Sequence, residues 1–283
     1  MEQDTKDSIP NEPDSRKKNR IFPSPRDILL KGILPLIILL IIWQAITLIA
    51  TRNQLYGPIG LDEVARSFVK LVLEGDTEGQ TLLVHASLSL YRVVLGFAAA
   101  ILTACPIGIA IGRYRVVDSI LGPVVEAMRP IPPIAWIPIS ILLFQSNFTG
   151  AQVFIIWVGA FFPILINTTA GVRRTKTVHL DVASTFGASE FQILKRIILP
   201  SAAPEIFAGL RIGFGIGWMC LVAAEMIGGG LGLGYLVIIT EQLGLVGQTI
   251  SAMLVIGLIG FVFSYLFLSV ERYLLKYREE IAV

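Results

Sequence analysis

The chain has 283 residues, of which 54% are hydrophobic and 16% charged, and its formal net charge at pH 7 is +2. Soluble domains carry about 25% charged residues, and the mean hydropathy here is +0.73, so the composition excludes an ordinary soluble protein. The basic residues are scattered and lack aromatic interleaving, which excludes a nucleic-acid-binding protein. We therefore expect an all-α integral membrane protein.

The first 28 residues are polar and rich in charge and proline, and no small-residue cleavage site follows the first apolar run, so they are not a secretory signal peptide. This composition predicts a disordered, basic, cytoplasmic tail. The cluster SRKKNR at 15–20 suits contact with the cytoplasmic leaflet, although binding of a partner is an alternative. Residues 29–283 then form the transmembrane domain.

Six apolar runs are long enough to cross a hydrocarbon core about 30 Å thick. They are residues 31–51, 86–112, 117–144, 151–172, 203–227 and 247–272. Lys and Arg gather in the N-terminal tail, near residues 113–115 and 173–196, and from residue 272 onwards. By the positive-inside rule, both termini and residues 181–200 are cytoplasmic in a multi-pass plasma (inner) membrane protein.

The connection 52–85 is then external. Within it, Val64, Phe68 and Leu71 recur at intervals of four and three residues, which predicts a short amphipathic helix at about 61–74. Such a helix either lies on the membrane surface or caps the helix bundle.

The third span contains the run RPIPPIAWIP, with four prolines. Proline removes amide donors, so the freed carbonyl groups must face protein or water, as in a cavity or gate. Arg129 lies about 16 Å along the span, near the midplane, at 1.5 Å per residue. We expect the path of an anion to be lined by Glu126, Arg129, Pro132, Pro133 and Trp136. Alternatively, Glu126 and Arg129 neutralise each other and pin neighbouring helices, while Trp136 only packs.

Residues 181–200, DVASTFGASEFQILKRIILP, form a compact amphipathic stretch between two spans. Apolar residues recur at helical spacing on each side of Gly187, which permits a sharp turn, and Pro200 is expected to end the helix. The pattern predicts a bent helical element in the cytoplasm. A helix resting on lipid would show the same periodicity.

The order of Asp181, Ala183, Gly187, Ile197, Leu199 and Pro200 fits the signature EAA-x3-G-x9-I-x-LP, with Asp181 in place of Glu and Val182 in place of the first Ala. The segment resembles the permease subunits of ATP-binding-cassette (ABC) importers with the type I fold. Residues 87–97, 128–139 and 223–236 are similar to the subgroup that imports nitrate, bicarbonate, taurine and alkyl sulfonates. Permeases for pyrimidine vitamin precursors are also similar.

The resemblance implies a fold of six transmembrane helices, paired as a homodimer with a second permease copy and embedded in membrane lipid. It also implies separate ABC ATPase subunits and an external substrate-binding protein. In this family the motif is a coupling helix, here about residues 181–196, which docks on the ATPase. The implied docking residues are Asp181, Ala183, Phe186, Gly187, Ala188, Glu190, Leu199 and Pro200.

The chain is expected to bind no cofactor or metal and to catalyse no reaction. No Gly-Lys pair occurs, so there is no P-loop, and ATP and Mg²⁺ are assigned to the partner ATPase. The run GGGLGLG at 228–234 lacks G-x-G-x-x-G and is expected to be a flexible external connection. Glu225 precedes it near the external mouth, where it either lines the entrance or binds the glycine loop.

Two other functions remain open at this stage. One is a self-contained carrier or channel with six spans that uses an ion gradient. The other is a non-transporting assembly or sensor subunit. Neither requires the cytoplasmic amphipathic element, and the second requires neither Arg129 in the membrane nor the proline-broken span.

Overall fold

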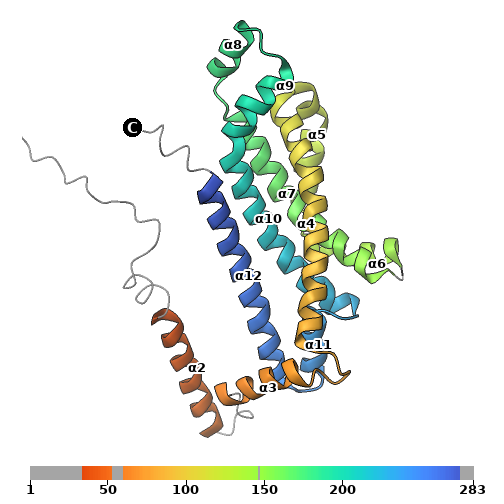
Figure 1. Cartoon of the computed structure of the whole chain (residues 1–283). Coiled ribbons are helices and arrows are strands. Elements are labelled where there is room, and N and C mark those ends of the chain that lie inside the picture. Colours follow the sequence, from red (N-terminus) through yellow and green to blue (C-terminus); the bar gives the residue numbers. More distant parts are fainter. Residues whose placement is uncertain (1–33, 53–59, 146, 275–283) are drawn as a thin grey trace, which may run out of the picture. The chain divides into compact units, whose positions relative to one another are not determined.

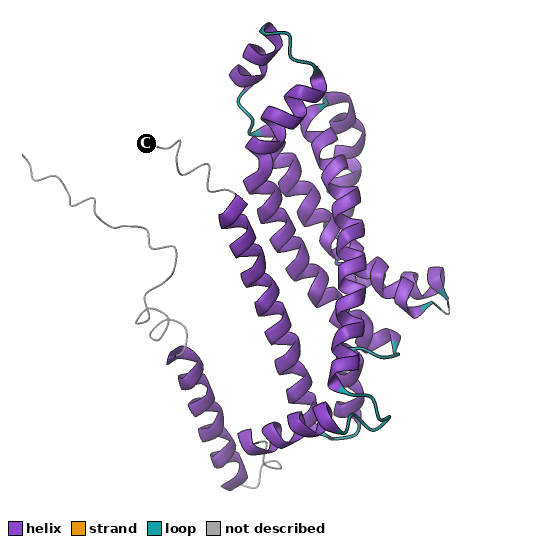
Figure 2. Ribbon diagram, in the orientation of Figure 1, coloured by secondary structure: helices purple, strands orange, loops and turns teal. Residues whose placement is uncertain are grey.

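The computed structural model describes residues 34–52, 60–145 and 147–274, and every regular element in these ranges is a helix (Figure 2). The predicted all-α class is therefore confirmed for these residues. The tail at 1–28 lies outside them. The chain divides into two compact units, residues 1–61 and residues 62–283. The first contains the apolar helix α2 (Leu34–Arg52).

The second unit contains four helices that are long and apolar enough to cross a membrane. These are α4 (Leu82–Arg113), α7 (Phe148–Arg173), α10 (Leu199–Gly228) and α12 (Val246–Leu274). A fifth span is formed if a bent pair of helices is counted as one, and α2 holds a shorter apolar stretch at Ile37–Ile49. The six-span count is thus not confirmed by the described residues.

The predicted span 117–144 is not one straight helix. It consists of α5 (Arg115–Met128), the short 3₁₀ helix η2 (Pro133–Trp136) and α6 (Ile137–Phe144), and its two halves are bent by 90°. Pro132 and Pro133 lie at the bend, where their missing amide donors prevent a continuous hydrogen-bond ladder. As a result α6 turns away from the bundle (Figure 1).

The remaining helices lie at the two ends of the bundle (Figure 1). One end carries α8 (Thr177–Thr185), α9 (Glu190–Ile193) and the π-helical η3 (Leu194–Ile198). The other end carries α3 (Leu61–Leu73) and α11 (Leu233–Gln242). Helix α3 packs on the start of α12, because Ser251 Oγ donates to the Val64 carbonyl at 3.1 Å. Helix α3 therefore contacts the end of the bundle.

Small residues allow α7 to lie closely between α4 and α10. On α4, a Cβ added to Gly108 would lie 2.9 Å from the Leu165 carbonyl oxygen of α7. On α10, a Cβ added to Gly213 would lie 3.0 Å from the Ala160 carbonyl oxygen of the same helix. Helices within lipid associate through such close backbone approach, since the hydrophobic effect gives little drive there. The three helices therefore form the packed centre of the bundle.

Replacement of Gly108 by leucine is expected to destabilise this centre by about 1–3 kcal/mol or more, because the larger side chain pushes α4 away from α7. The measurement is thermal unfolding of the detergent-solubilised chain. The matched control is Gly257→Leu on α12, where an added Cβ meets nothing within 4 Å. Equal midpoints for the two variants would show that the close approach of α4 and α7 contributes little.

Candidate functional site

The first candidate site is the predicted coupling segment. Helix α8 ends in a Schellman motif: the Ala188 amide donates to the Ala183 carbonyl and the Gly187 amide to the Ser184 carbonyl, both at 3.0 Å. Gly187 has a φ of 76°, a conformation that costs a residue with a Cβ about 1–2 kcal/mol. Its surroundings are open, since an added Cβ would meet nothing within 4 Å. Glycine is thus favoured at this position by the positive φ of the backbone, and not by a lack of room for a side chain.

Ser189 begins the next helix through a capping box. Its Oγ accepts from the Gln192 amide at 3.3 Å, and Gln192 Oε1 accepts from the Ser189 amide at 2.8 Å. These reciprocal bonds satisfy two amides that the first turn of a helix leaves unpaired. The turn at Gly187 and the cap at Ser189 together fix the angle between α8 and α9.

Ser189→Ala is expected to remove about 1 kcal/mol of helix stability at this start. Amide hydrogen exchange of residues 190–193 should then accelerate by about fivefold. Ser184→Ala is the control, because the Ser184 hydroxyl only bonds back to the Leu180 carbonyl within α8. Equal exchange in both variants would show that the capping box does not hold α9.

The helix does not end at Pro200, contrary to the prediction. Residues 190–228 run as one helix of 39 residues, with the π-helical turn η3 immediately before α10. In this turn the Leu199 amide donates to the Leu194 carbonyl, five residues earlier. Pro200 lacks an amide and its ring crowds the preceding turn, and a widened π turn is one way in which a helix accommodates such crowding. Leu199 and Pro200 therefore belong to the first turn of α10.

Two large apolar side chains of the coupling segment face outward. The exposed fractions of Phe186 and Phe191 are 86% and 70%. In contrast, Ile193 and Ile198 are buried in a cluster with Val172. Exposed aromatic side chains that flank a rigid turn are typical of a protein-binding surface.

The other predicted docking residues lie on the same segment or at its junction with α10. Asp181, Glu190 and Pro200 are exposed, whereas Ala183, Ala188 and Leu199 are half-buried. Glu190 also has a role that the motif did not indicate, since both of its carboxylate oxygens accept from Arg113 at 3.1 Å. That ion pair joins α9 to the end of α4.

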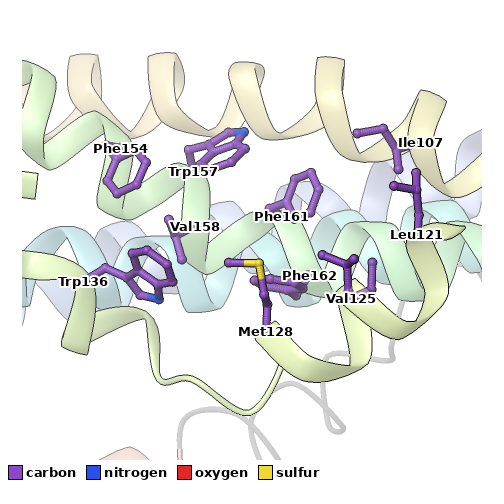
Figure 3. A pocket seen from close by; sticks show the side chains of 11 residues that line it. Ile107, Leu121, Val125, Met128, Trp136, Phe154, Trp157, Val158, Phe161 and Phe162 are labelled. Atoms are coloured by element: carbon purple, nitrogen blue, oxygen red, sulfur yellow. The ribbon is translucent and has the colours of Figure 1, made fainter. Parts of the chain in front are cut away.

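The second candidate site is an apolar cavity of 310 Å³ (Figure 3). Trp136 of η2 lies on one side of it. The cavity is otherwise lined by Ile107, Leu121, Val124, Val125, Met128, Phe154, Trp157, Val158, Phe161 and Phe162. The Trp136 indole nitrogen is buried and has no hydrogen-bond partner among the described residues. Because a lining of this kind offers an ion no compensating contact, the cavity is unsuited to binding a bare anion.

The charged pathway candidates lie beside this cavity and do not line it. Glu126 and Arg129, at the end of α5, are 4.0 Å apart, and their side chains are 72% and 55% exposed. An ion pair as long and exposed as this one contributes little. Pro132 is exposed and Pro133 is half-buried at the bend.

The third candidate site surrounds Glu225, which is fully buried at the opposite end of the bundle. Its carboxylate accepts from Arg92 Nη1 at 2.8 Å, from Ser89 Oγ at 2.8 Å and from the Gly234 amide at 2.9 Å. Arg92 also donates to the Leu231 carbonyl. Glu225 thus contacts the end of the glycine run 228–234 through the Gly234 amide.

His85 extends this network to the loop before α4. Its Nε2 lies 3.1 Å from Asp76 Oδ2, and its Nδ1 accepts from the Gly232 amide at 3.1 Å. The Leu233 amide donates to Ser89 Oγ at 2.9 Å. The connection 228–234 was predicted to be flexible, but its second half is held by these bonds. A signal for the site was present in the sequence, because His85, Ser89 and Arg92 follow one another at intervals of four and three residues, on one face of a helix.

These features define a helical membrane protein with a bent helical element at one end and a buried polar network at the other. Residues 93–277 match the family described as "Binding-protein-dependent transport system inner membrane component". The chain belongs to this family of ABC importer permeases, and the predicted resemblance is confirmed.

Several transport permeases are similar to most of the chain. It is 33% identical to the taurine transport system permease protein TauC of Escherichia coli, over 94% of this chain and 96% of that protein. It is 34% identical to the nitrate import permease protein NrtB of Synechococcus elongatus, over 88% and 91%. It is 30% identical to the putative aliphatic sulfonates transport permease protein SsuC of Bacillus subtilis, over 88% of each.

The fold is similar to a solved ABC transporter. The structure titled as inward-facing conformations of the MetNI methionine ABC transporter gives a TM-score of 0.55 and 19% identity, covering 66% of this chain and 93% of that chain. At this level of identity the likeness concerns the fold alone, and it confirms the predicted type I permease architecture.

Proposed function

We propose that this chain is the non-catalytic permease subunit of an importer for a small anion of the nitrate, bicarbonate, taurine or alkyl-sulfonate class. The observation that carries the proposal is the pair of exposed phenylalanines, Phe186 and Phe191, on either side of the Gly187 turn. A cytoplasmic ATPase subunit would cover them. ATP and Mg²⁺ would bind to that subunit, and this chain would hold no cofactor of its own.

Movement of the docked ATPase would reach the membrane through α10. The docking element continues into this helix without a break, from Glu190 to Gly228, so a displacement of α9 is carried along a rigid rod. ATP can drive the change only if the ATPase contacts the inward-open and outward-open states with different free energies. The Arg113–Glu190 pair would engage α4 in the same movement.

The anion would pass along the bent segment between α5 and α6. The long, exposed Glu126–Arg129 pair leaves the positive charge of Arg129 available to an anion. Trp136 and its apolar neighbours would act as a hydrophobic gate that excludes water and ions while it is closed. A second copy of the chain would complete the pathway as a homodimer, with both termini in the cytoplasm.

The substrate class rests on the relatives. The taurine, nitrate and aliphatic-sulfonate permeases are named for cargoes that each carry a sulfonate or oxyanion group, which favours a substrate with such a group over a pyrimidine vitamin precursor. A binding protein would deliver the anion on the external side. The family assignment likewise favours an ATP-driven importer over a self-contained carrier.

The test is ATP hydrolysis by the chain reconstituted with its ATPase and its binding protein, with each candidate anion in turn. One anion should stimulate hydrolysis in the wild type, and Gly187→Asp should abolish the stimulation. Gly244→Asp is the matched control, because Gly244 also has a positive φ, 71°, and open surroundings, but lies beyond α11. Equal loss in both variants, or stimulation by none of the anions, would contradict the proposal.

A further inference from the structure

We propose that His85, Ser89 and Arg92 are positioning residues that latch the glycine loop, residues 229–232, onto the head of α4, and that this latch releases during transport. The second part rests on the proposed function, whereas the first does not. The three residues lie on one face of α4 and are all buried. Each of them contacts the loop or the start of α11.

The loop is built as a hinge at one end and a fixed point at the other. Gly229 and Gly230 have φ values of 69° and 82°, and an added Cβ would meet nothing within 4 Å at either residue. In contrast, a Cβ at Gly232 or Gly234 would collide with Glu225. Gly229 and Gly230 thus have open surroundings and can act as the hinge, whereas Gly232 and Gly234 are packed against Glu225. A segment with these two properties can swing about its open end.

The fixed point depends on polar contacts that are shielded from water. The side chains of His85 and Asp76 are 0% and 1% exposed. A neutral imidazole with its proton on Nε2 donates to Asp76 and accepts from the Gly232 amide at once. The Gly232 carbonyl is also 3.0 Å from Nδ1, so this ring nitrogen faces Gly232 in either role. Nδ1 is therefore the atom that holds the loop, and Nε2 the atom that orients the ring.

The ion pair gives the latch its second contact. Arg92 and Glu225 are buried, and each also bonds the backbone that follows the hinge, Arg92 at the Leu231 carbonyl and Glu225 at the Gly234 amide. If the loop swings away, Arg92 loses the Leu231 carbonyl, whereas Glu225 keeps the Gly234 amide at the start of α11 and the two charges stay paired with each other. Such a step is possible without unfolding, because the pair itself need not break.

The latch joins the same two helices that the coupling segment joins. Glu190 begins the helix that runs to Gly228, and it pairs with Arg113 at the far end of α4. A sliding movement between α4 and α10 would strain the latch at one end and the Arg113–Glu190 pair at the other. Release of the loop is thus the expected response to movement of the docking element.

The test is the reactivity of a cysteine placed in the loop. Leu231→Cys leaves the carbonyl that Arg92 binds in place, and Cys105→Ala with Cys220→Ala removes the other thiols. The chain is held in lipid nanodiscs, where a hydrophilic maleimide reaches both faces.

Two substitutions of His85 separate its two ring nitrogens. His85→Asn retains a polar atom near the position of Nδ1, and His85→Gln retains one near the position of Nε2. We expect labelling to be about tenfold faster with His85→Gln, because one buried hydrogen bond is lost, and nearly unchanged with His85→Asn.

Equal labelling in the two variants, or faster labelling with His85→Asn, with unchanged size-exclusion profiles, would overturn the latch, because a space-filling role would favour the larger glutamine. His179→Gln, in α8, is the control for loss of a histidine. These experiments need neither ATPase nor substrate, so their failure leaves the proposed function intact. Release during transport is tested with the wild-type His85 in the reconstituted importer, where ATP turnover should accelerate the labelling of the Leu231→Cys variant by about tenfold. An unchanged rate during turnover would overturn the release.

Discussion

Alanine in place of Phe186 or Phe191 is expected to weaken binding of the ATPase subunit by about 30-fold for each residue. This corresponds to about 2 kcal/mol, the loss typical of an aromatic side chain at the centre of an interface. Both side chains are more than two-thirds exposed in the free chain, so their removal should leave the fold intact. The measurement is the dissociation constant between the detergent-solubilised permease and the ATPase.

The matched control is Leu73→Ala. Leu73 is 74% exposed, but it lies on α3 at the opposite end of the bundle (Figure 1). Its replacement should leave ATPase binding unchanged. Wild-type affinity in both phenylalanine variants would show that the ATPase docks on another surface. If residues 181–200 only rest on lipid, the permease should not bind the ATPase at all.

Removal of one partner of the buried Arg92–Glu225 pair is expected to destabilise the chain by about 3–5 kcal/mol. Arg92→Ala leaves the Glu225 carboxylate buried without its charged partner, and Glu225→Ala does the converse. The double variant Arg92→Met with Glu225→Leu should recover much of the loss, because it removes both charges and retains volume. The measurement is the free energy of unfolding in detergent.

The Arg211–Glu271 pair provides the comparison. Its atoms lie 3.1 Å apart, but the two side chains are 36% and 24% exposed, so Glu271→Ala should cost about 1 kcal/mol or less. Losses of similar size at Glu225 and Glu271 would show that the Arg92–Glu225 pair is not desolvated. A double variant that is no more stable than Arg92→Ala would show that the energy comes from packing.

The helical class and the approximate place of most spans could be predicted because membrane helices are marked by long apolar runs. The course of the third span could not. Its prolines indicated a broken backbone, but a bend of 90° depends on how α5 and α6 pack on their neighbours. Pro200 was misjudged for a related reason: a proline at the start of a helix is tolerated, and the π turn before it keeps the chain helical.

The bent helical element at 181–200 was accessible from sequence because its turn and its motif lie within a short stretch. The buried network around Glu225 was not, because it joins Asp76, His85 and Gly232 across more than half of the chain. The spacing of His85, Ser89 and Arg92 indicated only the part of this network that lies on α4. Its partners became identifiable only when the fold brought the glycine loop beside α4.

ATP-driven import by this chain is tested by uptake of the anion into proteoliposomes that contain the chain, its ATPase and its binding protein. Ion gradients are collapsed with ionophores, and ATP is supplied on the side of the ATPase. We expect uptake that requires ATP and the binding protein and is abolished by Gly187→Asp. In a second arm without ionophores, uptake by the chain alone along an imposed ion gradient, unaffected by ATP or by that substitution, would contradict this expectation.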